Sequence, residues 1–424
     1  MVWKRVFLFV FRLTCTAALE GWSCTRVASA EESAHPVALT LERTLQIAEM
    51  HAPNVKMAQH ALREAEALRI GAGIVLPSNP SLSMDFRPGV SAGWFNQPGY
   101  AATFNVPLEI GGAPGARIRE AQRAAEFARS DLGAQRWRAR AAAWAAYVRV
   151  RVAEQRLRLL SDSLESGERI VEACKNRANA GASGEIEQSL ATAEVAQIQA
   201  SIQDADGEFE QRIMGLRETL DIAPGQRLEL VTPLGEPPPA PEESTLIARA
   251  LARRPELVAI KDRISMLEAT DERLRKEVFP RIGIYAGVDK APDSAIFGLA
   301  GLSVELPVAQ RNQGPRARTA AARMTEMDRH DIEARRIARN AIAESRSYAA
   351  QREELRVLTD SALPAAERTL HFVELGWSAG QFDVFRVTTA AREAARVRGL
   401  RLDALEAAWL ARVALDYSVG GIDK

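Results

Sequence analysis

The spacing of apolar residues alternates between a helical period and a strand period along the chain. The runs TLQIAEMHAP (44–53) and LIARALARRP (246–255) each have a short amphipathic helical pattern that ends at a proline. Proline lacks a backbone N–H and restricts the residue before it, so a helix is expected to end there. A second helical stretch follows each proline and runs to a further proline, at 76–77 and at 279–280.

A period of two follows each of these helical stretches. Four segments have this pattern, 81–87, 100–107, 281–288 and 299–306, and each is predicted to be a strand. In the first segment Leu82, Met84 and Phe86 alternate with polar residues. Alternate side chains of a strand point to opposite faces, so one face of such a strand is apolar.

Long helical patterns follow the second strand of each half. Residues 113–180 and 313–379 have apolar positions three, four and seven residues apart, and beyond the first turn Pro364 alone interrupts them. Both segments are therefore predicted to be long helices, and about 67 residues of helix would span roughly 100 Å. Each ends in a glycine-bearing turn, at 180–184 or 376–380, and a returning helix follows.

The order of these elements occurs twice, which predicts two tandem repeats. The first repeat is expected at 38–221, with its long hairpin at 113–221, and the second at 244–418, with its hairpin at 313–417. A proline-rich connector, 222–243, joins them as an equatorial region. Chance similarity between two coiled coils is the alternative, but the ordered prolines, strands and turns favour a repeat.

Four strands are too few to close a barrel by themselves. Membrane barrels begin at about eight strands, and an open sheet in lipid would leave backbone groups unpaired. If these strands lie in a membrane, several chains must share one barrel: two copies would give eight strands, and three would give twelve and room for a lumen. The predicted fold class is mainly α with a shared membrane β-barrel.

Composition narrows the class of protein further. The chain has 424 residues, of which 47% are apolar, and 55 basic residues balance 55 acidic ones. This excludes a wholly disordered chain, and the lack of a basic excess argues against a nucleic-acid partner. Mean hydropathy is −0.16 and no run of about 18 apolar residues occurs, which excludes a bundle of membrane-spanning helices.

The first thirty residues have the features of a secretory signal. Lys4 and Arg5 precede the apolar stretch 6–11, and the small residues at 28–30 fit a cleavage site. Residues 1–30 are therefore expected to be a signal peptide that directs export. Two of the three cysteines would leave with it, so Cys174 would remain alone and no internal disulfide could form.

These features together resemble the TolC-like outer-membrane efflux family. The motifs that match it are the helix ends Leu76-Pro77 and Phe279-Pro280, the strand-to-helix passages 106–112 and 306–308, and the turns at Gly181 and Gly380. The runs 76–80 and 108–112 are most similar to the CzcC-type branch, the outer channels of heavy-metal cation efflux. Ala113-Pro114 departs from that branch, where a basic pair commonly follows the double glycine.

The resemblance implies a homotrimer in the outer membrane that extends into the periplasm. Its twelve-stranded barrel would continue as a helical tunnel, and a periplasmic adaptor and an inner-membrane RND pump would dock to it. The resemblance further implies passive conduction of substrates, most simply heavy-metal cations, with no enzymatic step and no cofactor. Drug efflux and type I protein secretion are the alternatives within the same class. A soluble periplasmic coiled-coil or adaptor protein is the alternative from another class.

The hairpin turns are the candidate functional sites. Asp383, Arg386, Glu185 and Glu187 are the candidates for a periplasmic gate, since charged rings select ions in channels. Carboxylates at these positions would also cap helices and interact favourably with their dipoles, which is the structural alternative. The resemblance implies that the glycines of the two turns are candidates for adaptor contact: Gly181, Gly184, Gly376 and Gly380.

No bound metal and no catalytic site are expected. The five histidines form no pair at a spacing that would place both on one helical face, and the densest cluster of possible ligands, 328–333, is better explained as a solvated helix face. Gly71-Ala72-Gly73 lacks the third glycine and the preceding strand of a dinucleotide site. Phosphate-binding loops and serine-hydrolase or zinc-protease motifs are also absent from the sequence.

Overall fold

The computed structural model describes residues 37–74, 76, 78–87, 98–179, 185–239, 241–292 and 294–421. The chain forms two compact units. The larger comprises Leu39–Pro224 and Leu230–Lys424, and the smaller comprises Met1–Ala38 and Gly225–Glu229. The expected signal peptide, 1–30, lies outside the described residues.

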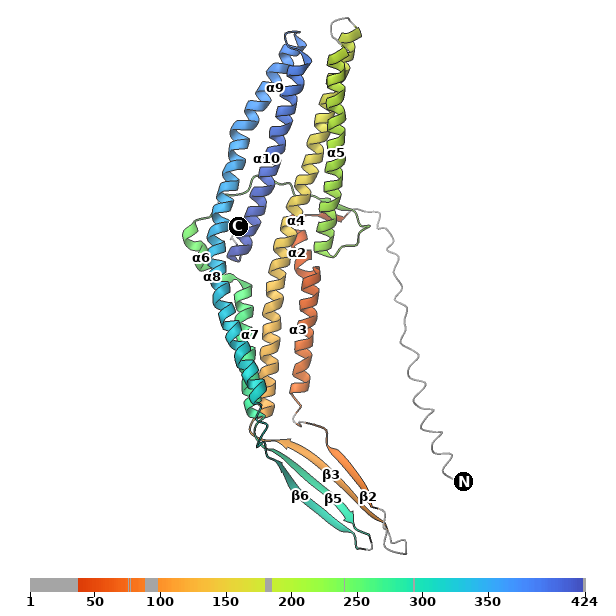
Figure 1. Cartoon of the computed structure of the whole chain (residues 1–424), viewed down its shortest axis with the longest axis vertical. Helices are drawn as coiled ribbons and strands as arrows, with labels where there is room; N and C mark the ends of the chain where they lie inside the picture. Colours follow the sequence, from red (N-terminus) through yellow and green to blue (C-terminus); the bar gives the residue numbers. More distant parts are fainter. Residues whose placement is uncertain are drawn as a thin grey trace, which may run out of the picture. The chain divides into compact units, whose positions relative to one another are not determined.

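The elements of the chain follow one another in the same order in its two halves (Figure 1). The first half contains α2 (Leu41–His51), α3 (Pro53–Ala72), β2 (Ser81–Arg87), β3 (Gly99–Glu109), α4 (Ala113–Asn179) and α5 (Glu185–Leu220). The second contains α6 (Glu243–Arg253), α7 (Pro255–Lys276), β5 (Arg281–Lys290), β6 (Phe297–Glu305), α8 (Gln313–Val357), η1 (Leu358–Ala362), α9 (Leu363–Ser378) and α10 (Val384–Val419). Two short strands, β1 (Val37–Leu39) and β4 (Leu228–Leu230), pair with each other.

The short helices begin and end where the sequence places prolines and caps. The Thr40 side chain accepts a hydrogen bond from the Arg43 amide at 3.1 Å and so caps α2. Ala52 and Arg254 have extended or non-helical backbone angles, and Pro53 and Pro255 then occupy the first positions of α3 and α7. Proline is well tolerated there because the first amides of a helix have no partner within it.

α4 is the longest helix and contacts most of the others. Its 67 residues pack against α3, α5, α7 and α10. Its buried side chains are mostly alanines, and larger buried side chains occur between Tyr147 and Ala153. Small side chains let neighbouring helices approach closely, so α4 can pack both against α5 of its own hairpin and against α10 of the other hairpin.

The second long helix differs from the sequence prediction, which ran it without a break from 313 to 379. The α-helical hydrogen bonding stops at Val357, and the π-helical turn η1 separates α8 from α9. Pro364 lies at the start of α9. It cannot donate an amide hydrogen bond and its ring crowds the preceding turn, which explains the widened turn just before it.

The larger sheet joins the two halves through its central strands. Its order is β2-β3-β5-β6, and all three pairs are antiparallel. β2 coincides with the predicted segment 81–87, and β3 and β5 extend up to two residues beyond the predicted ends. β6 begins two residues before its predicted start and ends one residue before its predicted end. Pro107 lies within β3 without disrupting it. The pairing of β2 with β3 begins at Asn105, so Pro107 has no partner residue on the β2 side and no hydrogen bond is lost there.

The register places apolar side chains on one face across all four strands. Val106, Ile284 and Leu302 form one such row across β3, β5 and β6. Met84 and Leu302 are 74% and 68% exposed, so this apolar face is uncovered in the single chain. The opposite face has polar residues such as Ser83 and Thr103, which pair with each other.

The passage from strand to long helix needs left-handed backbone in both halves. Gly111 has φ +81°, and a Cβ there would lie 2.4 Å from the ring of Phe279. Asn312, at the corresponding place in the second half, has φ +54°. Its amide donates to the carbonyl of Leu274 at 3.0 Å. Glycine and asparagine are the residues that adopt this conformation most readily.

Candidate functional site

The two helical hairpins, α4 with α5 and α9 with α10, contact each other close to their turns. Cys174 of α4, Ala191 of α5 and Val384 of α10 form a buried cluster, and Trp377 of α9 packs against it. Burial, with a smaller effect of the Glu187 carboxylate, raises the pKa of the Cys174 thiol above its ordinary value. This cysteine is therefore protonated and packs as a small apolar residue.

Polar contacts add to this cluster. The Arg177 guanidinium donates to the Trp377 carbonyl at 3.1 Å and lies 5.3 Å from the centre of its indole ring. On the adjacent turns Arg392 of α10 forms a two-pronged ion pair with Glu194 of α5. The hydrogen bond that Arg392 donates to the Glu194 carboxylate raises the pKa of Arg392 above its usual value. The hairpins of one chain are thus tied together near their turns.

The predicted gate residue Asp383 serves as a helix cap. Its carboxylate accepts a hydrogen bond from the Arg386 amide at 3.0 Å at the start of α10. The Arg386 guanidinium lies instead 5.1 Å from the centre of the Phe382 ring. Within the described chain the two side chains form no ion pair with each other, so contact between them across subunits stays a prediction.

The remaining candidates lie at or beside the two turns. Gly376 is covered by the Phe382 ring, which a Cβ would meet at 2.4 Å, and Gly380 has φ +76°. Both positions of the second turn therefore require glycine for local structural reasons. Glu185 and Glu187 are in the first turn of α5. Gly181 and Gly184 lie outside the described residues.

The connector between the halves is held by a site that sequence reasoning missed. The Tyr147 hydroxyl of α4 accepts from the Thr232 amide at 3.0 Å and donates to the Thr232 carbonyl at 3.2 Å. One turn later, the buried Arg151 donates to the Leu230 carbonyl at 3.2 Å. Residues four apart share a helix face, so the two side chains act on one segment.

The second half repeats this arrangement on α8. Tyr348 donates its hydroxyl to the Pro238 carbonyl, and Arg352 donates to the Pro237 carbonyl at 3.3 Å. Between the two pairs, the Trp409 indole donates to the Gly235 carbonyl at 2.8 Å. A Tyr-x3-Arg spacing at equivalent places of both long helices was the sequence signal for these connector clamps, Tyr147/Arg151 and Tyr348/Arg352.

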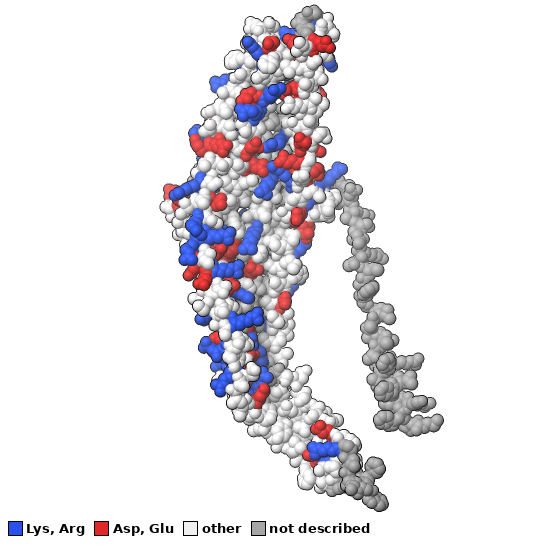
Figure 2. Space-filling model, in the orientation of Figure 1, with Lys and Arg blue, Asp and Glu red and all other residues white. Residues whose placement is uncertain are grey.

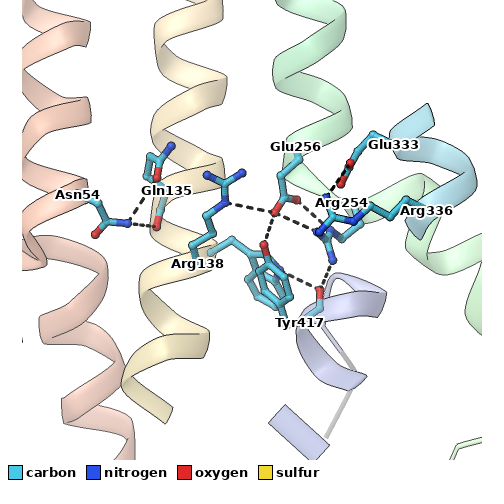
Figure 3. Close-up of polar contacts among 9 residues, drawn as sticks. Asn54, Gln135, Arg138, Arg254, Glu256, Glu333, Arg336 and Tyr417 are labelled. Atoms are coloured by element: carbon cyan, nitrogen blue, oxygen red, sulfur yellow. Dashed lines mark hydrogen bonds and ion pairs between the residues drawn. The ribbon is translucent and has the colours of Figure 1, made fainter. Parts of the chain in front are cut away.

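A buried polar network joins the end of α10 to the junction of α6 and α7 (Figure 3). Arg254 and Glu256 form a two-pronged ion pair with distances of 2.9 and 3.1 Å. The Tyr417 hydroxyl donates to the same carboxylate at 2.7 Å, and Arg254 donates to the Tyr417 carbonyl at 2.8 Å. Burial raises the pKa of Tyr417 above its ordinary value, and the Glu256 carboxylate adds to this effect.

The equivalent place in the first half is only weakly polar. Asn54 donates to the Gln135 carbonyl and side chain at 3.4 Å each (Figure 3). Charge is therefore concentrated at the second junction, where Arg138 of α4 also approaches Glu256 at 3.9 Å. This network fixes α4, α7 and α10 to one another.

Charges follow a simple distribution over the molecule. On the face seen in Figure 2, acidic and basic side chains interleave over the helices, while the sheet is almost free of charge. An ion pair of Arg87 and Asp289, 3.5 Å apart, lies at one end of the sheet. Among the described residues, no helix is both long and apolar enough to cross a membrane. The same residues hold no cluster of three potential metal ligands.

Comparisons with known proteins identify the family of the chain. A family model described as "Outer membrane efflux protein" matches residues 44–220. The cobalt-zinc-cadmium resistance protein CzcC of Cupriavidus metallidurans is 26% identical over 395 residues, which cover 92% of this chain and 91% of that protein. Residues 44–220 belong to the outer membrane efflux protein family. The resemblance seen in the sequence is confirmed.

Solved structures of outer membrane efflux proteins have the same fold. VceC of Vibrio cholerae matches with a TM-score of 0.72 and 16% identity, over 90% of this chain and 96% of that one. The open state of MtrE of Neisseria gonorrhoeae matches with a TM-score of 0.72 and 16% identity, over 90% and 89%. These likenesses confirm the mainly helical fold class with its small sheet.

Membership of this family decides two further points. Outer membrane efflux proteins are channels rather than enzymes, as the sequence predicted. They reside in the outer membrane and extend into the periplasm, which excludes the alternative of a soluble periplasmic adaptor. The gate and adaptor-contact residues stay predictions.

Proposed function

We propose that this chain is the outer-membrane channel of a tripartite RND-type efflux system and conducts heavy-metal cations. A periplasmic adaptor and an inner-membrane pump would deliver the cations, and the channel would conduct them passively. The likeness to a cobalt-zinc-cadmium resistance protein over nine-tenths of both chains supports the metal substrate. The proposed role of the polypeptide itself is to provide the path along which the cations cross the outer membrane.

The observation that carries the channel function is the exposed apolar face of the sheet. Its apolar rows run across all four strands, whereas the other face is polar. Apolar side chains facing outward and polar ones facing inward are what a membrane barrel requires. Charged residues lie mostly toward the strand ends, Asp85 excepted, so the middle of the sheet suits the hydrocarbon layer.

The edges of the sheet support a trimer. β2 and β6 each pair with one strand only in the described chain. Backbone groups of an open edge cannot remain unpaired in lipid, so β6 of one copy must pair with β2 of the next. Three copies would give a twelve-stranded barrel wide enough for a lumen. The helices that follow the strands would continue this ring as a periplasmic tunnel.

Metal tolerance tests the proposed substrate. Deletion of the gene from its host is expected to lower tolerance of cobalt, zinc or cadmium several-fold, and a plasmid copy should restore it. Tolerance of hydrophobic drugs and the amount of secreted proteins should not change. Unchanged metal tolerance together with a loss of drug tolerance or protein secretion would instead favour the corresponding alternative.

The gate is proposed to lie between subunits. Arg177 with Trp377, and Glu194 with Arg392, already tie the two hairpins of one chain together. Contacts that break on opening are therefore assigned to neighbouring chains, with Asp383 and Arg386 as the first pair.

Removing both of these charges is expected to favour the open channel. Three exposed pairs of about 0.5 kcal/mol each would shift the opening equilibrium roughly tenfold. The double variant Asp383→Asn, Arg386→Gln keeps the helix cap, since asparagine caps as well as aspartate. Single-channel recording in planar bilayers should show longer openings with trimers intact. If the openings are unchanged, the gate lies elsewhere, with Glu185 and Glu187 the next pair to replace.

A further inference from the structure

Basic residues are concentrated where the helices adjoin the four-stranded sheet. The segments at this place form what we call the junction collar: 69–74, 109–119, 273–281 and 305–318. They contain ten basic residues and three acidic ones. The segments at the other end of the sheet, 85–100 and 289–297, contain two basic and three acidic residues. On the face seen in Figure 2, basic side chains gather on the helices next to the sheet. The two ends of one sheet therefore differ strongly in charge.

Ion pairs within the chain neutralise only part of the junction collar. Arg275 and Arg316 share the Asp271 carboxylate, at 2.6 and 3.3 Å. Other bases have no carboxylate within 4 Å in the described part of the chain, and they include Lys276, Arg311 and Arg318. The last two are exposed and Lys276 is half-buried. The collar thus carries positive charge that the single chain does not compensate.

Exposed apolar residues lie among these bases. Leu306 and Val308, in the turn between β6 and α8, are 66% and 77% exposed, and Arg311 follows three residues later. At the end of α7 the Lys276 ammonium lies 5.6 Å from the centre of the Phe279 ring, which is also exposed. Apolar side chains flanked by long basic ones are typical of a membrane–water interface. There the apolar groups enter the lipid and the charged ends reach the headgroups.

We infer that the junction collar binds the anionic headgroups of phospholipids in the periplasmic leaflet of the outer membrane. This inference rests on the proposed barrel, because a sheet that crosses the membrane puts its junction with the periplasmic helices at that leaflet. Anionic headgroups accept charge-assisted hydrogen bonds from ammonium and guanidinium groups. The attraction falls off within a Debye length, about 8 Å at physiological salt, so the bases must lie directly beside the lipid-facing strands, as they do here.

The combination of charge with exposed apolar side chains favours a lipid surface over a soluble anion. A free anion would neutralise the bases but leave Leu306 and Val308 in water. A ring of bases around a water-filled lumen would leave the same two side chains in water as well. A lipid leaflet covers the apolar groups and neutralises the bases together, because it presents acyl chains and anionic headgroups a few ångströms apart.

Lipid binding to the purified protein tests this surface. Native mass spectrometry in detergent, with phosphatidylglycerol or zwitterionic phosphatidylethanolamine added, gives the amount of each lipid retained per trimer. The unsubstituted protein is expected to retain several-fold more phosphatidylglycerol, and added salt should reduce this preference. The triple variant Lys276→Gln, Arg311→Gln, Arg318→Gln should bind phosphatidylglycerol about tenfold or more weakly, since each basic residue near an anionic lipid strengthens binding about fivefold.

Two control variants separate the collar from charge in general. Arg158→Gln, Arg169→Gln, Lys175→Gln removes the same charge from α4 closer to its turn, where Arg158 and Lys175 are exposed. Its lipid binding should be unchanged. The charge-retaining variant Lys276→Arg, Arg311→Lys, Arg318→Lys should bind phosphatidylglycerol as the unsubstituted protein does.

Each remaining outcome decides against the inference in a recognisable way. Equal retention of the two lipids by the unsubstituted protein, or an equal loss in the control on α4, would overturn lipid binding by the collar and leave the channel function standing. Unchanged lipid binding with altered ion selectivity in planar bilayers would place these bases in the lumen, which also overturns it. If the neutral variant does not assemble, a phosphatidylglycerol preference of the unsubstituted trimer that about 0.5 M salt does not reduce would overturn it. A protein that forms no trimer and retains neither lipid would overturn the proposed barrel as well.

Discussion

Replacing Glu256 with alanine is expected to lower the free energy of unfolding by about 3–5 kcal/mol, because the change leaves a buried guanidinium without its partner. The Arg254 and Glu256 side chains are each only 7% exposed. The same substitution removes the acceptor of the Tyr417 hydroxyl. The loss should appear as a lower urea midpoint of the helical circular dichroism of the detergent-solubilised protein.

An exposed ion pair of the same chain provides the matched control. Arg346 and Glu243 lie 3.0 Å apart, with side chains that are 73% and 46% exposed. Glu243→Ala should cost only about 0–1 kcal/mol. Glu256→Gln, which keeps an acceptor for Tyr417 but no charge, should fall between the two. If Glu256→Ala is no more harmful than Glu243→Ala, the buried network does not stabilise the junction of α6, α7 and α10.

Placing arginine on the apolar face of the sheet should reduce the amount of assembled trimer strongly. Met84 and Ile284 both lie on this face, and each is expected to face lipid in the proposed barrel. A lipid-facing arginine at mid-depth costs about 2–4 kcal/mol. Native gels of outer membranes, compared at equal expression, should show much less trimer for Met84→Arg and Ile284→Arg than for the unsubstituted protein.

Ser83→Arg is the matched variant because Ser83 neighbours Met84 and lies on the polar face. A long charged side chain is tolerated in a water-filled lumen, so its trimer yield should be close to normal. Equal losses in all three variants, or equal yields, would show that the assignment of the two faces is wrong.

Local rules were sufficient to place most elements from the sequence. Pro53 and Pro255 locate the starts of α3 and α7 because proline acts on its own helix turn. The alternation at 81–87 predicts both β2 and its apolar face, since it depends only on successive residues. The glycine-bearing turn at 376–380 was likewise predictable, because a left-handed residue such as Gly380 is a local requirement.

Features that depend on distant residues could not be read in this way. Glu256 lies two residues from Arg254, but its burial depends on Tyr417, which is 161 residues away. The π-helical turn η1 was not predicted, because a proline in a long helical pattern indicates that the helix is interrupted but does not indicate the kind of turn that forms there. For Asp383 the sequence allowed two roles, because a carboxylate directly after a turn can cap a helix or belong to a gate. The structure shows the helix cap.

The connector clamps have a consequence for how the chain tolerates change. Tyr147, Arg151, Tyr348 and Arg352 all contact main-chain groups, and so does Trp409. Carbonyl oxygens are common to every amino acid, so the hydrogen bonds of these clamps do not themselves depend on which side chains residues 230–238 carry. The number of residues in the segment 230–238 cannot change, because one inserted residue would shift every carbonyl beyond it away from its donor. The clamps thus specify the length of this segment, whereas its composition is specified only where its own side chains pack or bond, as at Thr232 and Leu234.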